Sequence, residues 1–158
     1  MNITEHFSRS EFTLSQTAAR QGIVNDPTEP QWLIITGLCE YVLEPTRALM
    51  GALTVSSGYR CPELNTVIGG SSRSDHMILG TSCAVDLVHP RLGDLFRMLY
   101  WMPWSKLIWE YDRWVHVSWD QNGPPPGRFP WIKTDTRNYE NLTYEEMCNL
   151  GVDSGRPV

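Results

Sequence analysis

Lys106–Trp119, KLIWEYDRWVHVSW, is the stretch of sequence that decides the fold. It holds two runs, Lys106–Tyr111 and Trp114–Trp119, that are rich in β-branched and aromatic residues, as strands are. The very short connection between them is typical of antiparallel neighbours. The stretch therefore predicts a β-hairpin, and His116 lies in its second strand.

The length of the turn sets which side chains share a face with His116. A two-residue turn at 112–113 points Glu110 to the opposite face from His116. A three-residue turn, Tyr111–Arg113, puts Glu110 and His116 on one face as near neighbours, because side chains alternate along a strand. We favour the three-residue turn, which leaves Asp112 at the tip, a common place for aspartate.

Outward from the hairpin, the remaining segments alternate between helical and strand patterns. The sequence predicts helices at 30–51, 62–68 and 92–102 and strands at 53–56 and 83–88. A short helix is expected within Phe7–Arg20, capped either by Ser10 or by Ser8 together with Glu11. Pro45 is expected to break or restart the long helix. The total predicts an α+β fold, a small antiparallel sheet with helices packed on it.

Composition limits the classes of function. The 158 residues fit one domain, and a net charge of −5 excludes the basic stripe of a nucleic-acid binder. No run of apolar residues is long enough to insert in a membrane. The start, Met1–His6, lacks the features of a secretory signal, so we expect a protein that begins in the cytoplasm with its four cysteines reduced. For a chain of this size we expect a monomer. The proline-rich loop Gly123–Gly127 is expected to separate a core domain, 1–120, from an extension, 121–158, that packs on the core or trails from it.

Two histidines and one aspartate in the middle of the chain suggest a metal site. His76 ends the polar motif Ser74-Asp75-His76, Asp86 lies inside an apolar run, and His116 lies in the hairpin. An unpaired buried carboxylate is costly, so Asp86 requires a metal or a cation. Three such ligands with an open fourth position are the plan of a catalytic zinc, which activates a bound water.

A carboxylate must accept the proton of that water, and Glu110 is our first choice, with Asp112 as the second. Arg60 is a candidate catalytic residue, because a fixed guanidinium stabilises an oxyanion, and it is also a candidate for binding a substrate carboxylate. Ser74 is expected to bind the substrate backbone.

These residues belong to motifs that run in a recognisable order. The motifs are Ser57–Arg60, Asn65–Gly70, Ser74-x-His76, Ala84-x-Asp86, Leu107–Glu110 and Trp114–Ser118. They resemble the zinc D-alanyl-D-alanine carboxypeptidases and L-alanyl-D-glutamate endopeptidases, which share the hedgehog/DD-peptidase fold. His6–Phe12 and Val42–Arg47 look like the lead-in of the phage-encoded, endolysin-like branch, and the resemblance covers residues 5–119.

The resemblance implies a zinc ion held by His76, Asp86 and His116, and a peptidoglycan stem peptide as the substrate. Two departures stand out. The segment between His76 and Asp86 carries about three extra residues, an insertion that costs little closure entropy. Where many relatives have the base, this chain has Arg113, and Glu110 matches the position used by the phage-encoded branch.

The leading hypothesis is an L-alanyl-D-glutamate endopeptidase that acts on the cell wall during phage lysis of a bacterial host. A D-alanyl-D-alanine carboxypeptidase is the near alternative. A virion or wall-binding module that keeps the fold without catalysis is the alternative from another class of function, and cleavage of any wall peptide would exclude it.

Overall fold

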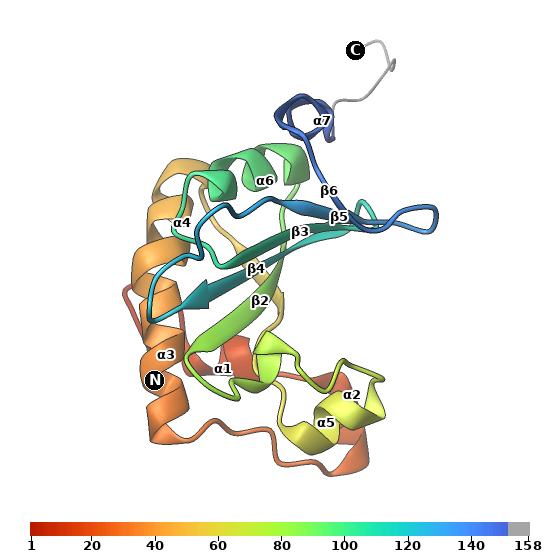
Figure 1. Cartoon of the computed structure of the whole chain (residues 1–158). Coiled ribbons are helices and arrows are strands. Elements are labelled where there is room, and N and C mark those ends of the chain that lie inside the picture. Colours follow the sequence, from red (N-terminus) through yellow and green to blue (C-terminus); the bar gives the residue numbers. More distant parts are fainter. Residues whose placement is uncertain (152–158) are drawn as a thin grey trace.

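A six-stranded sheet in the order β1-β2-β4-β3-β5-β6 forms the centre of the computed structural model, which describes residues 1–151 (Figure 1). The strands are β1 (Thr54–Ser57), β2 (Ser82–Val88), β3 (Lys106–Glu110), β4 (Trp114–Asp120), β5 (Trp131–Lys133) and β6 (Asn138–Asn141). The α+β fold is confirmed, but the sheet is larger than predicted and mixed, because β5 pairs in parallel with β3. The part of the predicted extension at 152–158 lies outside the described residues.

Helices lie around this sheet (Figure 1). They are α1 (Arg9–Thr13), α2 (Gln16–Gln21), α3 (Glu29–Leu38), α4 (Glu44–Met50), α5 (Pro62–Val67), α6 (Leu92–Tyr100) and α7 (Tyr144–Asn149), with a π-helical turn η1 (Cys39–Leu43) and a 3-10 turn η2 (Asp75–Met77). Of these, α3 and α6 pack directly against the strands. No helix in the described part of the chain is both long and apolar enough to cross a membrane.

The hairpin register follows the three-residue turn. Ile108 pairs with His116 and Glu110 pairs with Trp114, so the turn is Tyr111–Arg113 as predicted. Tyr111 takes the left-handed backbone conformation, with a φ of 55°. Glu110 and His116 therefore share one face of the sheet.

The long N-terminal helix restarts at Pro45, one of the two predicted outcomes, because α4 begins at Glu44 with Pro45 in its first turn. Pro45 has no N–H to donate to the preceding turn, and the wider π-helical turn η1 absorbs the missing hydrogen bond just before it. At the chain start, Ser8 and Glu11 form the capping box of α1, which confirms one of the two predicted caps and excludes Ser10.

The two faces of the sheet have different partners. On one face, α6 packs its buried Phe96 edge-on against Trp109, and their ring centroids are 5.8 Å apart. The extension also joins the apolar core, because Ile132 of β5, Leu142 and Met147 of α7 are buried there. The opposite face of the sheet carries His116 and is the face on which the chemistry gathers.

Gly37 on α3 lets the helix approach the sheet closely. A Cβ built at this glycine would lie 2.3 Å from the ring of Trp119, which is buried and stacked on Tyr41. We expect Gly37→Ala to lower the free energy of unfolding by about 1–3 kcal/mol, because a packed core resists an added methyl group.

Thermal and urea unfolding measure this loss, and Gly80→Ala is the matched control, since a Cβ there meets open space. Equal stability of the two variants would show that α3 can move away from Trp119 at no cost.

Candidate metal centre

Neighbouring strands bring two of the predicted ligands face to face. Asp86 of β2 pairs directly with His116 of β4, and η2 carries His76 in from the side. The Oδ1 atom of Asp86 lies 2.9 Å from Nδ1 of His116 and 3.3 Å from Nε2 of His76. One donor atom from each of the three residues lies within 4.8 Å of the other two.

Outer hydrogen bonds fix the tautomer of His76. Its Nδ1 lies 2.7 Å from the carbonyl oxygen of Gly58, and a carbonyl oxygen only accepts. Nδ1 therefore carries the proton, and the lone pair on Nε2 points at Asp86. Burial lowers the pKa of His76, so the imidazole is neutral at neutral pH.

The tautomer of His116 is fixed by a longer chain of hydrogen bonds. The hydroxyl of Ser118 donates to Asp75 at 2.8 Å, so it must accept from Nε2 of His116, at 2.9 Å. Asp75 also accepts from Lys106 at 2.8 Å. Although burial raises the pKa of Asp75, the hydrogen bonds from Lys106 and Ser118 outweigh it, and the net shift is downward.

Asp86 is held as a carboxylate by what surrounds it. Burial alone would raise its pKa, but positive charge on the imidazoles of His76 and His116, or a cation bound between them, holds the pKa well below its usual range. Its second oxygen, Oδ2, accepts from Arg60 at 3.0 Å, which leaves Oδ1 for the centre of the cluster. Arg60 is itself held by Ser57, which a bulge in β1 sets beside Asp86.

The donor set fits a zinc ion. Two imidazole lone pairs and a carboxylate oxygen point at one another, an arrangement that repels unless a cation lies between them. Tetrahedral zinc ligands lie about 2.0–2.2 Å from the metal, so donors in one site are about 3.3 Å apart, close to the two distances from Asp86. Three protein ligands leave the fourth position for water or substrate.

The insertion between His76 and Asp86 does not separate the ligands. Ile78 takes a left-handed conformation with a φ of 52° and, like Met77, is buried. The backbone carbonyls of both residues accept from the side chain of Gln31 on α3. These contacts tie the start of the inserted segment to α3.

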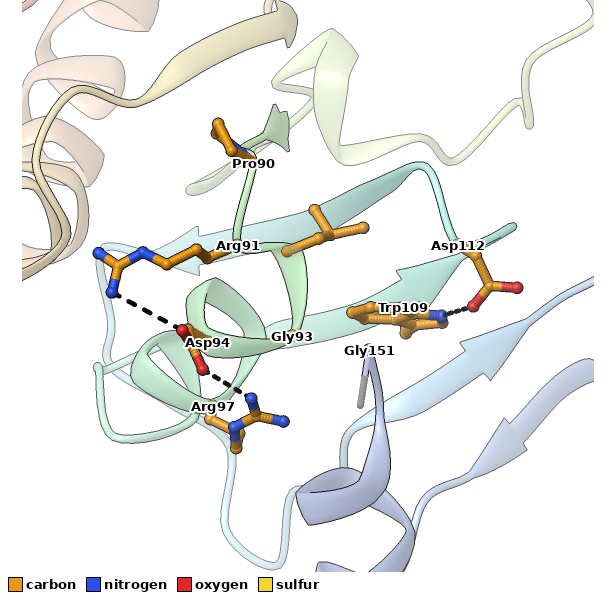
Figure 2. Close-up of a pocket in the computed structure, with 9 residues that line it drawn as sticks. Pro90, Arg91, Gly93, Asp94, Arg97, Trp109, Asp112 and Gly151 are labelled. Atoms are coloured by element: carbon orange, nitrogen blue, oxygen red, sulfur yellow. Dashed lines mark hydrogen bonds and ion pairs between the residues drawn. The ribbon is translucent and has the colours of Figure 1, made fainter. Parts of the chain in front are cut away.

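The two candidate bases lie on opposite faces of the sheet. Glu110 shares the face of His116 and accepts from the indole N–H of Trp114 at 2.6 Å. Asp112 accepts from Trp109 at 2.6 Å on the α6 face, in a separate pocket beside the start of that helix (Figure 2). This geometry favours Glu110 as the base.

Of the other predicted residues, Arg60 connects the cluster to a groove, because it donates to Asp86 and also lines that groove. Arg60, together with Ser57 and Tyr59, lines a hollow of about 380 Å³ that extends toward α2. Ser74 lies outside that groove, at the N-cap position of η2 and two residues before His76, and its side chain makes no capping hydrogen bond. The sequence reasoning missed Asp75, Lys106 and Ser118, although Ser118 follows His116 at the two-residue spacing that puts both on one face.

Removal of either imidazole should abolish metal binding. We expect His76→Ala and His116→Ala to bind no zinc at micromolar ion, because two remaining ligands no longer form a closed site. Competition with a chromophoric chelator and metal analysis of the purified proteins measure the loss.

His89→Ala is the matched control, since His89 accepts a hydrogen bond from the backbone of Arg91 and takes no part in the cluster. Full zinc affinity in His76→Ala would exclude the proposed ligand set.

The comparison with known proteins agrees with this geometry. A family model described as peptidase M15 matches residues 5–118, and the match includes all three predicted ligands. No individual curated protein matches the chain. β5, β6 and α7 lie beyond the matched residues. With the cluster and the match taken together, the chain belongs to the peptidase M15 family of metallopeptidases.

Proposed function

We propose that this protein is a zinc peptidase that cleaves the stem peptides of bacterial peptidoglycan, as an L-alanyl-D-glutamate endopeptidase in phage lysis of a host. The observation that carries the proposal is the cluster of His76, Asp86 and His116, whose outer hydrogen bonds turn three lone pairs toward one point. The family match supports the peptidase chemistry, and the resemblance of the N-terminal motifs to the phage-encoded branch supports the role in lysis.

Bound zinc lowers the pKa of a coordinated water and polarises the scissile carbonyl. The residues of the chain do the rest. Glu110 accepts the proton of the attacking water, since it is a diagonal neighbour of His116, about 7 Å away on the same face. The indole of Trp114 holds Oε2 of Glu110, which orients Oε1 for the transfer. The proton then passes to the leaving amine.

Arg60 acts where the groove meets the cluster. Its Nε and Nη2 atoms are bound to Ser57 and Asp86, so the guanidinium is fixed in place. The remaining N–H groups stabilise the negative charge that develops on the carbonyl oxygen. Ser74, at the start of η2, binds the substrate backbone.

Digestion of purified Gram-negative sacculi tests the function. We expect the zinc-loaded protein to release fragments with new D-glutamate amino termini, identified by mass spectrometry, and a chelator to abolish them. Release of free D-alanine would instead assign the carboxypeptidase reaction. Intact sacculi after treatment with folded, zinc-loaded protein would exclude peptidoglycan hydrolysis.

The assignment of the base is tested separately. We expect Glu110→Gln to keep zinc affinity and to lower turnover by about a hundredfold or more, the usual scale for loss of a general base. Asp112→Asn is the matched control on the other face of the sheet and should retain turnover. The reverse result would transfer the role of the base to Asp112.

A further inference from the structure

The C-terminal extension adds a second side to the face that carries the metal centre. β5 lies beside β3 in parallel register, with Lys133 paired to Glu110, so these two side chains share a face. The backbone N–H of Tyr111 donates to the carbonyl of Lys133 at 2.7 Å and ties β5 to the turn of the hairpin. Lys133 therefore belongs to the wall of the site, although it lies outside the family match.

Tyr139 lies next to Lys133 at an irregularity in the β5–β6 pairing. Its backbone is left-handed, with a φ of 55°, and its side chain is half exposed. The ammonium of Lys133 lies 5.0 Å from the centre of the Tyr139 ring. Burial, and then the negative charge of Glu110, raise the pKa of Tyr139, so the hydroxyl stays protonated and can donate.

A hollow of about 260 Å³ opens between the two turns that this arrangement sets side by side. Tyr111, Arg113 and Trp114 line it from the β3–β4 hairpin, and Asp135 lines it from the β5–β6 loop. Both turns extend to the same side of the molecule (Figure 1). Trp114 connects the hollow to the proposed base, because its indole N–H donates to Glu110, while Lys133 and Tyr139 are not among the lining residues.

The carboxylates described in the site do not form ion pairs with Lys133. Within the described residues it makes no ion pair within 4.0 Å, and Glu110 is bound to Trp114 instead. The hydrogen bond that Lys133 does make goes to the neutral side chain of Asn138. An ammonium with a neutral partner, beside a protonated phenol, is suited to bind a carboxylate.

We propose that Lys133 and Tyr139 bind a carboxylate of the peptide substrate close to the bond that is cut. This inference rests on the proposed function, and it names the part of the substrate that the extension recognises. Lys133 is two strands away from His116 and two residues out of line with it, about 12 Å at the usual strand spacing and rise. About four residues of extended peptide span that distance at about 3.3 Å per residue.

Calorimetry on full-length, zinc-loaded Glu110→Gln protein tests the proposal without turnover. The probes are a synthetic stem peptide with free carboxylates and the same peptide with every carboxylate amidated. We expect Lys133→Met to weaken binding of the free peptide by about tenfold to a hundredfold, the range for a charged hydrogen bond. Tyr139→Phe should weaken it by a smaller factor. Neither change should affect the amidated peptide.

Arg137→Met is the control for loss of a cation on the same extension, because Arg137 pairs with Glu140 and Glu146 instead. Unchanged affinity in Lys133→Met, with sacculi still cleaved by the wild-type protein, would overturn the carboxylate site and leave the proposed function standing. Binding that depends on Lys133 without any cleavage of sacculi would support the carboxylate site and exclude the proposed peptidoglycan hydrolysis. Failure to bind either peptide would overturn the site.

Discussion

The pairing of Asp86 with His116 across β2 and β4 is the constraint on which the rest of the site depends. Side chains alternate along a strand, so a slip of one residue would turn one ligand into the opposite layer of the protein. The register is held along the whole strand pair by a buried apolar core, in which Val85 faces Val117. The metal centre is therefore a consequence of how the sheet packs.

The surrounding contacts convert that register into a defined set of lone pairs. Each imidazole is tied to a different part of the chain, His76 to Gly58 and His116 through Ser118 to Asp75. An isolated carboxylate in a protein core is destabilising. The charge of Asp86 is instead compensated by His76, His116 and Arg60. Outer partners of this kind set the orientation and basicity of metal ligands. Residues of both strands and of the neighbouring loops therefore orient the three ligands.

Much of this could be predicted from the sequence. Alternation in the hairpin left two faces for Glu110, and the favoured three-residue turn gave the observed one. The motifs around His76, Asp86 and His116 predicted the three residues that the structure brings together. Pro45 marked the restart of the long helix, but the π-helical turn before it, which accommodates the missing donor, has no visible signal in the sequence. β5 escaped because Trp131–Lys133 is too short to show a period. Its parallel pairing with β3 is a long-range choice that local patterns do not encode.

The position of β5 has a consequence for the integrity of the protein. A sheet that ended at β3 would present a row of unpaired backbone groups next to Trp109 and Ile108, both apolar. Such an open edge is a template for pairing with another copy of the chain, and hence for aggregation. The short β5 covers it, and β6 closes the sheet with polar, exposed residues, Asn138–Asn141. A protein shortened to the residues shared with its family would therefore be at risk of self-association before it lost any part of its metal centre.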